Sequence, residues 1–97
     1  MDWQGTPEDP HGYMKLRDFM SEAAARVAAA GHTDAAERLR VAGSWVGMPS
    51  EWMGESALAL KTALALDDLP GDLAVDLNDA LSAIRTGFQR VGHIPNF

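Results

Sequence analysis

The fold is decided by the stretch Leu73–Val91, which reads LAVDLNDALSAIRTGFQRV. Apolar residues recur there every three or four positions, a spacing that places them on one face of an α-helix. They are Leu73, Leu77, Leu81, Ile84, Phe88 and Val91. A second stripe, at positions i, i+4 and i+7, is made of Asp72, Asp76 and Asp79. The stretch therefore predicts an amphipathic helix with one buried face and one solvated, negatively charged face.

A first helix is predicted from Pro10 or Tyr13 to Ala30. Asp9 followed by Pro10 is a typical helix start, and Gly31 is a typical helix end. The apolar stripe of this helix is made of Tyr13, Leu16, Met20, Ala23, Val27 and Ala30. Its polar side is predicted to face water, and it carries Arg17, Asp18, Glu22 and Arg26. Because Glu22 precedes Arg26 by four residues, the two side chains are expected to form an ion pair.

A second helix is predicted to start at Thr33 or Asp34, with Glu37 placed as in a capping box. Residues 47–49 end it, and Ser50 is predicted to cap a third helix. The residues expected to point inward are Ala35, Leu39, Ala42 and Val46 in the second helix, and Met53, Ala57, Leu60 and Leu64 in the third.

The turn at residues 67–71 leads into the last helix, which is predicted to start between Pro70 and Asp72 and to end at Gly92. Four helices joined by short connections favour antiparallel neighbours. We therefore predict an all-α fold, a compact antiparallel four-helix bundle, with an irregular three-helix core plus one short helix as the alternative. Residues 1–97 are expected to form a single acidic domain, with an irregular arm at 1–9 and a short tail at 93–97.

The chain is acidic, since its 97 residues include 14 acidic and 8 basic side chains and carry a net charge of −6. Such a domain is repelled by nucleic acid and anionic lipid and is attracted to basic proteins. The alternative is that the charge only keeps a small protein soluble. The absence of cysteine excludes disulfides and thiol chemistry. Because there is neither a signal-peptide pattern nor a membrane-spanning segment, we expect a cytoplasmic protein that binds no membrane.

The sequence holds no pattern typical of catalysis, metal binding or nucleic-acid binding. His11, His32 and His93 lie in three separate loop or terminal positions, without the spacing of a metal site. The second and third helices have the order of a helix-turn-helix, but the third begins with Glu51 and Glu55, which phosphates repel. We therefore predict a protein that is not an enzyme, with no catalytic residue, metal or cofactor, and no nucleic-acid partner.

Two regions are candidates for binding another protein. Between Lys61 and Arg85 there are five aspartates and no basic residue, which would steer a basic partner; the alternative is a solvated helix face. Residues 45–55 hold two tryptophans and two methionines, as binding sites often do; the alternative is that the rings pack in the core. In this corner, Gly54 is expected to let another backbone approach. The residues predicted to contact a partner are Asp68, Asp72, Asp76, Asp79, Trp45, Met48 and Trp52.

In size, acidity and helical content the chain resembles the small bacterial inhibitors: immunity proteins of nuclease toxins, antitoxins and phage-encoded inhibitors. The resemblance implies a helical protein-binding module that binds and blocks a basic partner protein. The alternative is a self-assembling structural or adaptor protein with no inhibitory role. In that case the tryptophan-methionine corner and the tail ending in Phe97 would form a homo-oligomer, with a two-fold dimer as the default.

Overall fold

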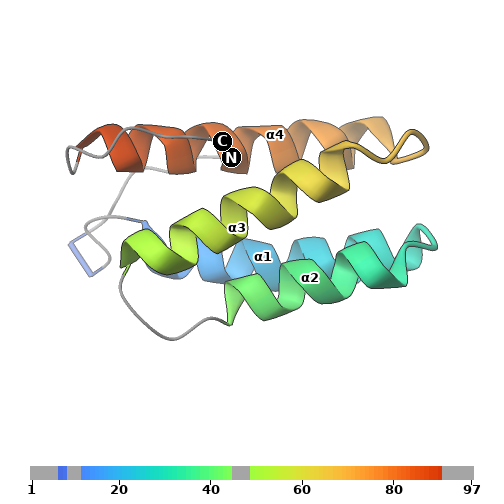
Figure 1. Cartoon of the computed structure of the whole chain (residues 1–97), viewed down its shortest axis with the longest axis horizontal. Helices are drawn as coiled ribbons and strands as arrows, with labels where there is room; N and C mark the ends of the chain where they lie inside the picture. Colours follow the sequence, from blue (N-terminus) through green and yellow to red (C-terminus); the bar gives the residue numbers. More distant parts are fainter. Residues whose placement is uncertain (1–6, 9–11, 45–48, 91–97) are drawn as a thin grey trace.

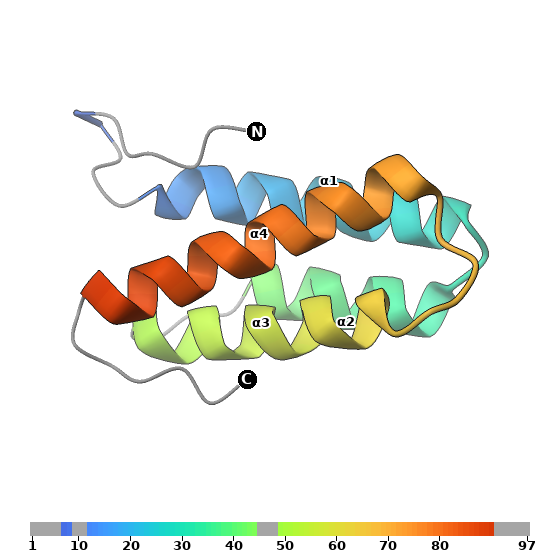
Figure 2. The same ribbon diagram turned by 90° about the horizontal axis from the view of Figure 1, so that it is seen from above.

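The fold was analysed in a computed structural model, which describes residues 7–8, 12–44 and 49–90. Its helices are α1 (Tyr13–Ala29), α2 (Thr33–Gly43), α3 (Pro49–Leu64) and α4 (Gly71–Arg90). Consecutive helices run in opposite directions, so the α1–α2 connection and the α3–α4 turn lie at the same end of the molecule (Figures 1 and 2). The predicted antiparallel four-helix bundle is confirmed.

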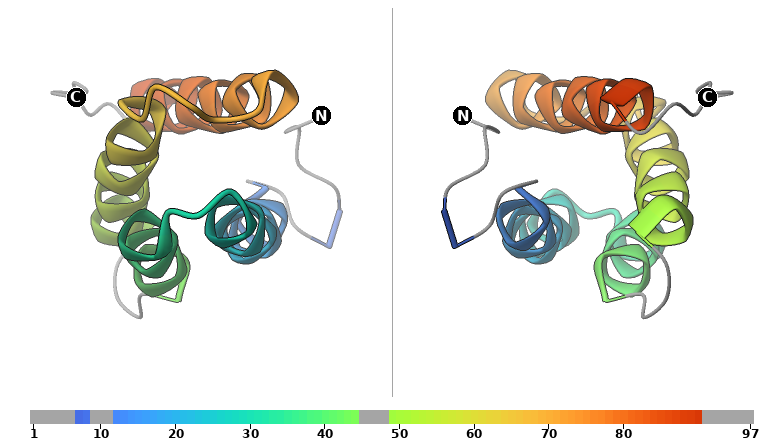
Figure 3. Two further views of the ribbon diagram at one scale, coloured as in Figure 1. Left: turned by 90° about the vertical axis from the view of Figure 1, so that its right-hand side faces the viewer. Right: turned by 90° about the vertical axis from the view of Figure 1, so that its left-hand side faces the viewer.

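The helices pack mainly against their neighbours in the chain. The α1–α2 contact is the most extensive, the α2–α3 and α3–α4 contacts follow, and the contact between α1 and α4 is much smaller than these three. Seen along the helices, α1 and α2 lie side by side, and α4 lies opposite them. Helix α3 connects this pair of helices with α4 (Figure 3). The bundle measures 35 × 27 × 23 Å.

The core confirms most of the predicted apolar stripes. In α4, Leu73, Leu77, Leu81 and Ile84 are buried, whereas the side chain of Phe88 and the whole of Val91 lie outside the described residues. In α1, Phe19 and Ala24, which adjoin the predicted stripe in sequence, are buried together with Leu16, Met20, Ala23 and Val27. Among the described residues, eight of the twenty buried apolar side chains are alanines: Ala23, Ala24, Ala36, Ala42, Ala57, Ala59, Ala63 and Ala80. Because alanine adds little bulk, these positions let the helix axes come close together.

A glycine at the end of α2 lets this helix lie close to α1. A Cβ atom added to Gly43 would lie 2.6 Å from the Cβ of Met20 in α1, far inside ordinary van der Waals distance. Leu39 and Ala42, predicted to point inward, are buried on the same helix. Ala35 is only half-buried, and Val46 lies outside the described residues.

The start of α1 confirms one of the two predicted positions. Helix α1 begins at Tyr13, the later of the two predicted positions, and its cap is Gly12 in a left-handed conformation with φ 73°. Only glycine adopts such a backbone without steric cost. The alternative start at Asp9 and Pro10 lies outside the described residues.

The caps predicted for α2 and α3 are wrong. His32 occupies the cap position of α2 and makes no capping bond through its side chain. The Glu37 carboxylate accepts hydrogen bonds from the Arg40 guanidinium instead of closing a capping box. Helix α3 begins at Pro49, where a proline is favoured because the first helical residue needs no N–H donor, so Ser50 is the second helical residue.

Candidate protein-binding surface

The acidic side chains of residues 67–79 form a surface at the α3–α4 turn and the first turns of α4, which we call the acidic surface. Asp67, Asp68 and Asp72 are exposed, whereas Asp76 and Asp79 are half-buried. The helix periodicity places Asp72, Asp76 and Asp79 along one edge of α4. The expectation of a fully solvated stripe is therefore wrong for its last two members.

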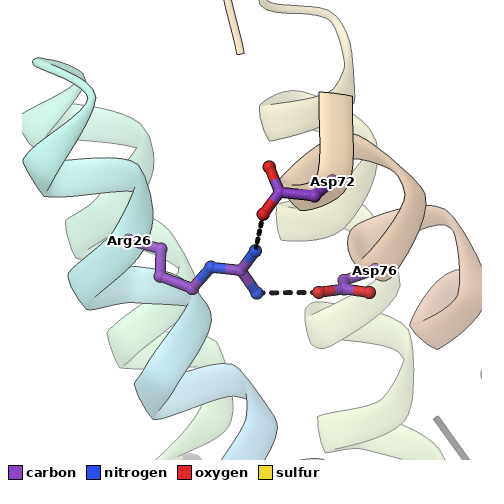
Figure 4. Close-up of polar contacts among 3 residues, drawn as sticks. All are labelled: Arg26, Asp72 and Asp76. Atoms are coloured by element: carbon purple, nitrogen blue, oxygen red, sulfur yellow. Dashed lines mark hydrogen bonds and ion pairs between the residues drawn. The ribbon is translucent and has the colours of Figure 1, made fainter. Parts of the chain in front are cut away.

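Part of this surface is held by an arginine from the opposite helix. The Arg26 guanidinium, near the end of α1, donates one hydrogen bond to Asp76 at 2.8 Å and a second to Asp72 at 3.3 Å (Figure 4). The two carboxylates can share one guanidinium because they are one helical turn apart. The hydrogen bond to Asp76 raises the pKa of Arg26 above its usual value, so the guanidinium stays charged.

These contacts correct two predictions about α1. Arg26 was predicted to face water, but its side chain is only 31% exposed. It was also predicted to pair with Glu22, but its guanidinium reaches across to α4 and donates to Asp76. The acidic stripe of α4 is likewise not free of basic neighbours, although no basic residue is near it in the sequence. Both Asp72 and Asp76 accept their bonds through one carboxylate oxygen, Oδ2.

A second polar contact joins the two connections at this end of the bundle. Gly31 adopts a positive φ of 97° after α1, and the chain then places His32 beside the α3–α4 turn. His32 Nε2 lies 2.6 Å from Asp68 Oδ1. Together with Arg26, this contact means that Asp68, Asp72 and Asp76 each have a partner within the chain.

The acidic surface nevertheless keeps an excess of negative charge. Of its five carboxylates, those of Asp72 and Asp76 share the Arg26 guanidinium. That of Asp68 contacts His32, which adds charge only when it is protonated. Asp67 and Asp79 complete the five. Two of the carboxylates that have a partner remain mostly exposed, at 72% for Asp68 and 82% for Asp72. The surface can therefore still attract a cation from solution.

The tryptophan-methionine corner has a different place in the structure. The ring of Trp52 is 2% exposed and belongs to the core, as the alternative interpretation expected. Tyr13 packs edge-on against it with ring centroids 5.7 Å apart, and the Arg17 guanidinium lies 4.8 Å from its centroid. The Trp52 ring is thus not on the surface and is not available to a partner. Trp45 and Met48 lie outside the described residues.

Gly54 and Arg17 also differ from expectation. A Cβ atom added to Gly54 would meet no atom of the described residues within 4 Å, so none of their backbone approaches it. Arg17, expected to face water, is half-buried between the Trp52 ring and the end of α2, where it donates to the Gly43 carbonyl at 3.4 Å. Arginine combines these contacts readily because its guanidinium is flat and carries several donors.

One surface feature was missed by sequence reasoning. A groove of about 350 Å³ runs between α2 and α3. It is lined by Glu37, Arg38, Val41, Ala42, Glu55, Leu58 and Ala59. Val41 is 46% exposed and Leu58 is 50% exposed, so two aliphatic side chains face solvent there. The only available signal was that both residues fall outside the predicted apolar stripes of their helices.

Two observations on the described residues concern metal binding and a buried hydroxyl. Among them, no group of three or more histidine, aspartate or glutamate side chains could hold a metal ion. The Ser56 hydroxyl is fully buried and has no hydrogen-bond partner within this part of the chain, so nothing there activates it as a nucleophile. None of the helices described is both long and apolar enough to cross a membrane.

Comparisons with models of known protein families, with curated proteins and with solved structures find no match to this chain. The case for a function therefore rests on the surfaces described above.

Proposed function

We propose that the chain is a protein-binding module that binds and blocks a basic partner protein in the cytoplasm, in the manner of a small inhibitor, antitoxin or immunity protein. The observation that carries this proposal is the charge excess of the acidic surface, where one guanidinium pairs with only two of the five carboxylates. An excess of this kind raises the rate of association with a basic protein and selects against acidic partners.

The contacts within the acidic surface favour binding over simple solvation. Arg26 fixes Asp72 and Asp76 on one edge of α4, so their carboxylates lose little freedom when a partner binds. Each of the two keeps an oxygen, Oδ1, that Arg26 does not contact. A carboxylate accepts several hydrogen bonds, so an arginine or lysine of the partner can add to the surface without displacing Arg26.

The test uses variants that remove charge without breaking the contacts to Arg26 and His32. Asp67→Asn with Asp79→Asn removes two charges from the acidic surface. Asp18→Asn with Glu22→Gln removes two charges from exposed positions of α1 and serves as the matched control. Each immobilised protein is exposed to lysate of the source cell at low and at moderate salt, and the retained proteins are identified by mass spectrometry.

We expect the wild type and the control to retain the same basic protein in a one-to-one ratio, and this retention to fall as the salt concentration rises. The acidic-surface variant is expected to retain less of it at low salt. Equal retention by both variants would contradict the role of the acidic surface, and retention of no basic protein by the wild type would contradict the proposed function.

A further inference from the structure

The groove between α2 and α3 has an apolar centre. Its floor includes the buried alanines Ala42 and Ala59, and its edges carry the exposed side chains of Val41 and Leu58. Small residues below and aliphatic residues at the rim leave a concave strip that water covers at a free-energy cost.

The two ends of the groove carry opposite charges. Because α2 and α3 are antiparallel, Arg38 lies beside Thr62, to which its guanidinium donates a long bond of 3.5 Å. Glu55 lies nearly two turns before Thr62 on α3 and therefore lines the other end. Glu37 is also near the Arg38 end, but Arg40 neutralises it. The groove is thus basic at one end, apolar in the middle and acidic at the other end.

We propose that this groove is the contact face of a two-fold symmetric dimer, occupied by a second copy of the same chain. A strip with opposite charges at its ends is complementary to itself when it is rotated by half a turn about its centre. In that arrangement Arg38 of each copy faces Glu55 of the other, and Val41 and Leu58 of the two copies cover each other. A uniformly basic partner fits this groove less well, since Arg38 would repel it.

This inference does not rest on the proposed function. The groove belongs to α2 and α3, whereas the acidic surface belongs to the α3–α4 turn and α4, so a dimer would carry two open acidic surfaces. The groove face is small beside the roughly 800 Å² per partner of a standard stable interface. We therefore expect a weak dimer, which requires measurement up to roughly millimolar protein.

The test is sedimentation equilibrium of the full chain from micromolar to millimolar concentration. The wild type is expected to dimerise, and Arg38→Glu and Glu55→Arg are each expected to raise the dimer dissociation constant roughly tenfold or more. An equimolar mixture of the two variants is expected to dimerise again, because a mixed dimer restores both opposite-charge pairs. The matched control is Asp18→Lys on α1, which should change dimerisation little.

Several outcomes would overturn the inference. They are a wild type that stays monomeric at millimolar concentration, single variants that dimerise as well as the wild type, and a mixture that stays monomeric. An effect of net charge alone predicts the opposite result for one variant. Glu55→Arg lowers the net negative charge of the protein, so weaker repulsion between copies would strengthen dimerisation. Circular dichroism checks that each variant is folded, and all substituted charges are exposed. Dimerisation is read without the basic partner, so this result and the lysate capture can fail independently.

Discussion

The two ends of the bundle are held together in different ways. At the packed end, the first half of α1 lies against Gly43 of α2 and Trp52 of α3, with side chains in close contact. At the ionic end, Arg26 and His32 reach the aspartates at the α3–α4 turn and the start of α4. The difference indicates that volume controls stability at one end, whereas charge and salt control it at the other.

The largest effect is expected at the packed end from Trp52→Ala. Removing a buried ring of this size costs about 3–5 kcal/mol of the free energy of unfolding, since a cavity replaces the ring and its contacts with Tyr13 and Arg17. Urea unfolding followed by circular dichroism measures the loss. Trp52→Phe keeps part of the packing and should lose less, which matters if the alanine variant does not fold. A loss below about 1 kcal/mol would place the ring outside the core.

A smaller loss is expected from Gly43→Ala, which adds one methyl group where Met20 leaves no room. Overpacking of this kind costs about 1–3 kcal/mol. Gly54→Ala is the matched control, because the same methyl group meets nothing there and replaces glycine within a helix. The control is expected to stabilise the protein by about 0.5–1 kcal/mol. Thermal unfolding of both variants measures the change in stability. If both melting temperatures shift in the same direction, Gly43 is not more tightly packed than Gly54.

At the ionic end, Arg26→Gln is expected to cost about 1 kcal/mol at low salt, because two aspartates lose their shared cation. The cost should shrink in molar salt, which screens charges that are partly exposed. Urea unfolding at both salt concentrations measures it. A salt-independent loss would mean that the Arg26 stem contributes by packing rather than by charge.

The smallest effect is expected from Glu37→Gln, which removes an ion pair within a single helix. The hydrogen bond from Arg40 lowers the pKa of Glu37, so the stabilisation is present above the ordinary glutamate pKa of about 4.3 and is lost as the pH falls through the lowered value. The wild type should thus be slightly more stable than the variant at neutral pH and equal to it at an acid pH below the lowered pKa of Glu37. Unfolding curves at both pH values test this, and a gap that widens in acid would contradict it.

The helices could be predicted from the sequence because helical periodicity depends on residues that are close together in the chain. The spacing of Leu73, Leu77 and Leu81 was enough to place them in the core. It could not reveal that Arg26 binds Asp76, since these residues are 50 positions apart and their contact depends on how α1 and α4 are placed. The groove was missed for the same reason, because its walls come from two helices.

Helix caps were the least predictable local feature. The spacing of Asp34 and Glu37 fits a capping box, yet Glu37 has a competing partner in Arg40 one turn later. The Arg40 guanidinium offers the carboxylate two donors, whereas a capping box offers it one backbone N–H. Gly12 caps α1 because its backbone adopts a left-handed conformation. The periodicity of side chains does not predict such a conformation.

The order of helix packing has a consequence for how fast the chain folds. Contacts form mainly between helices that follow each other, and the α1–α4 contact, which joins the most distant segments, is less extensive than any of these. Folding rates rise as contacting residues lie closer in sequence, because less chain entropy is lost before contacts form. We therefore expect refolding within about a millisecond or faster, with the closure of α1 on α4 as the last step.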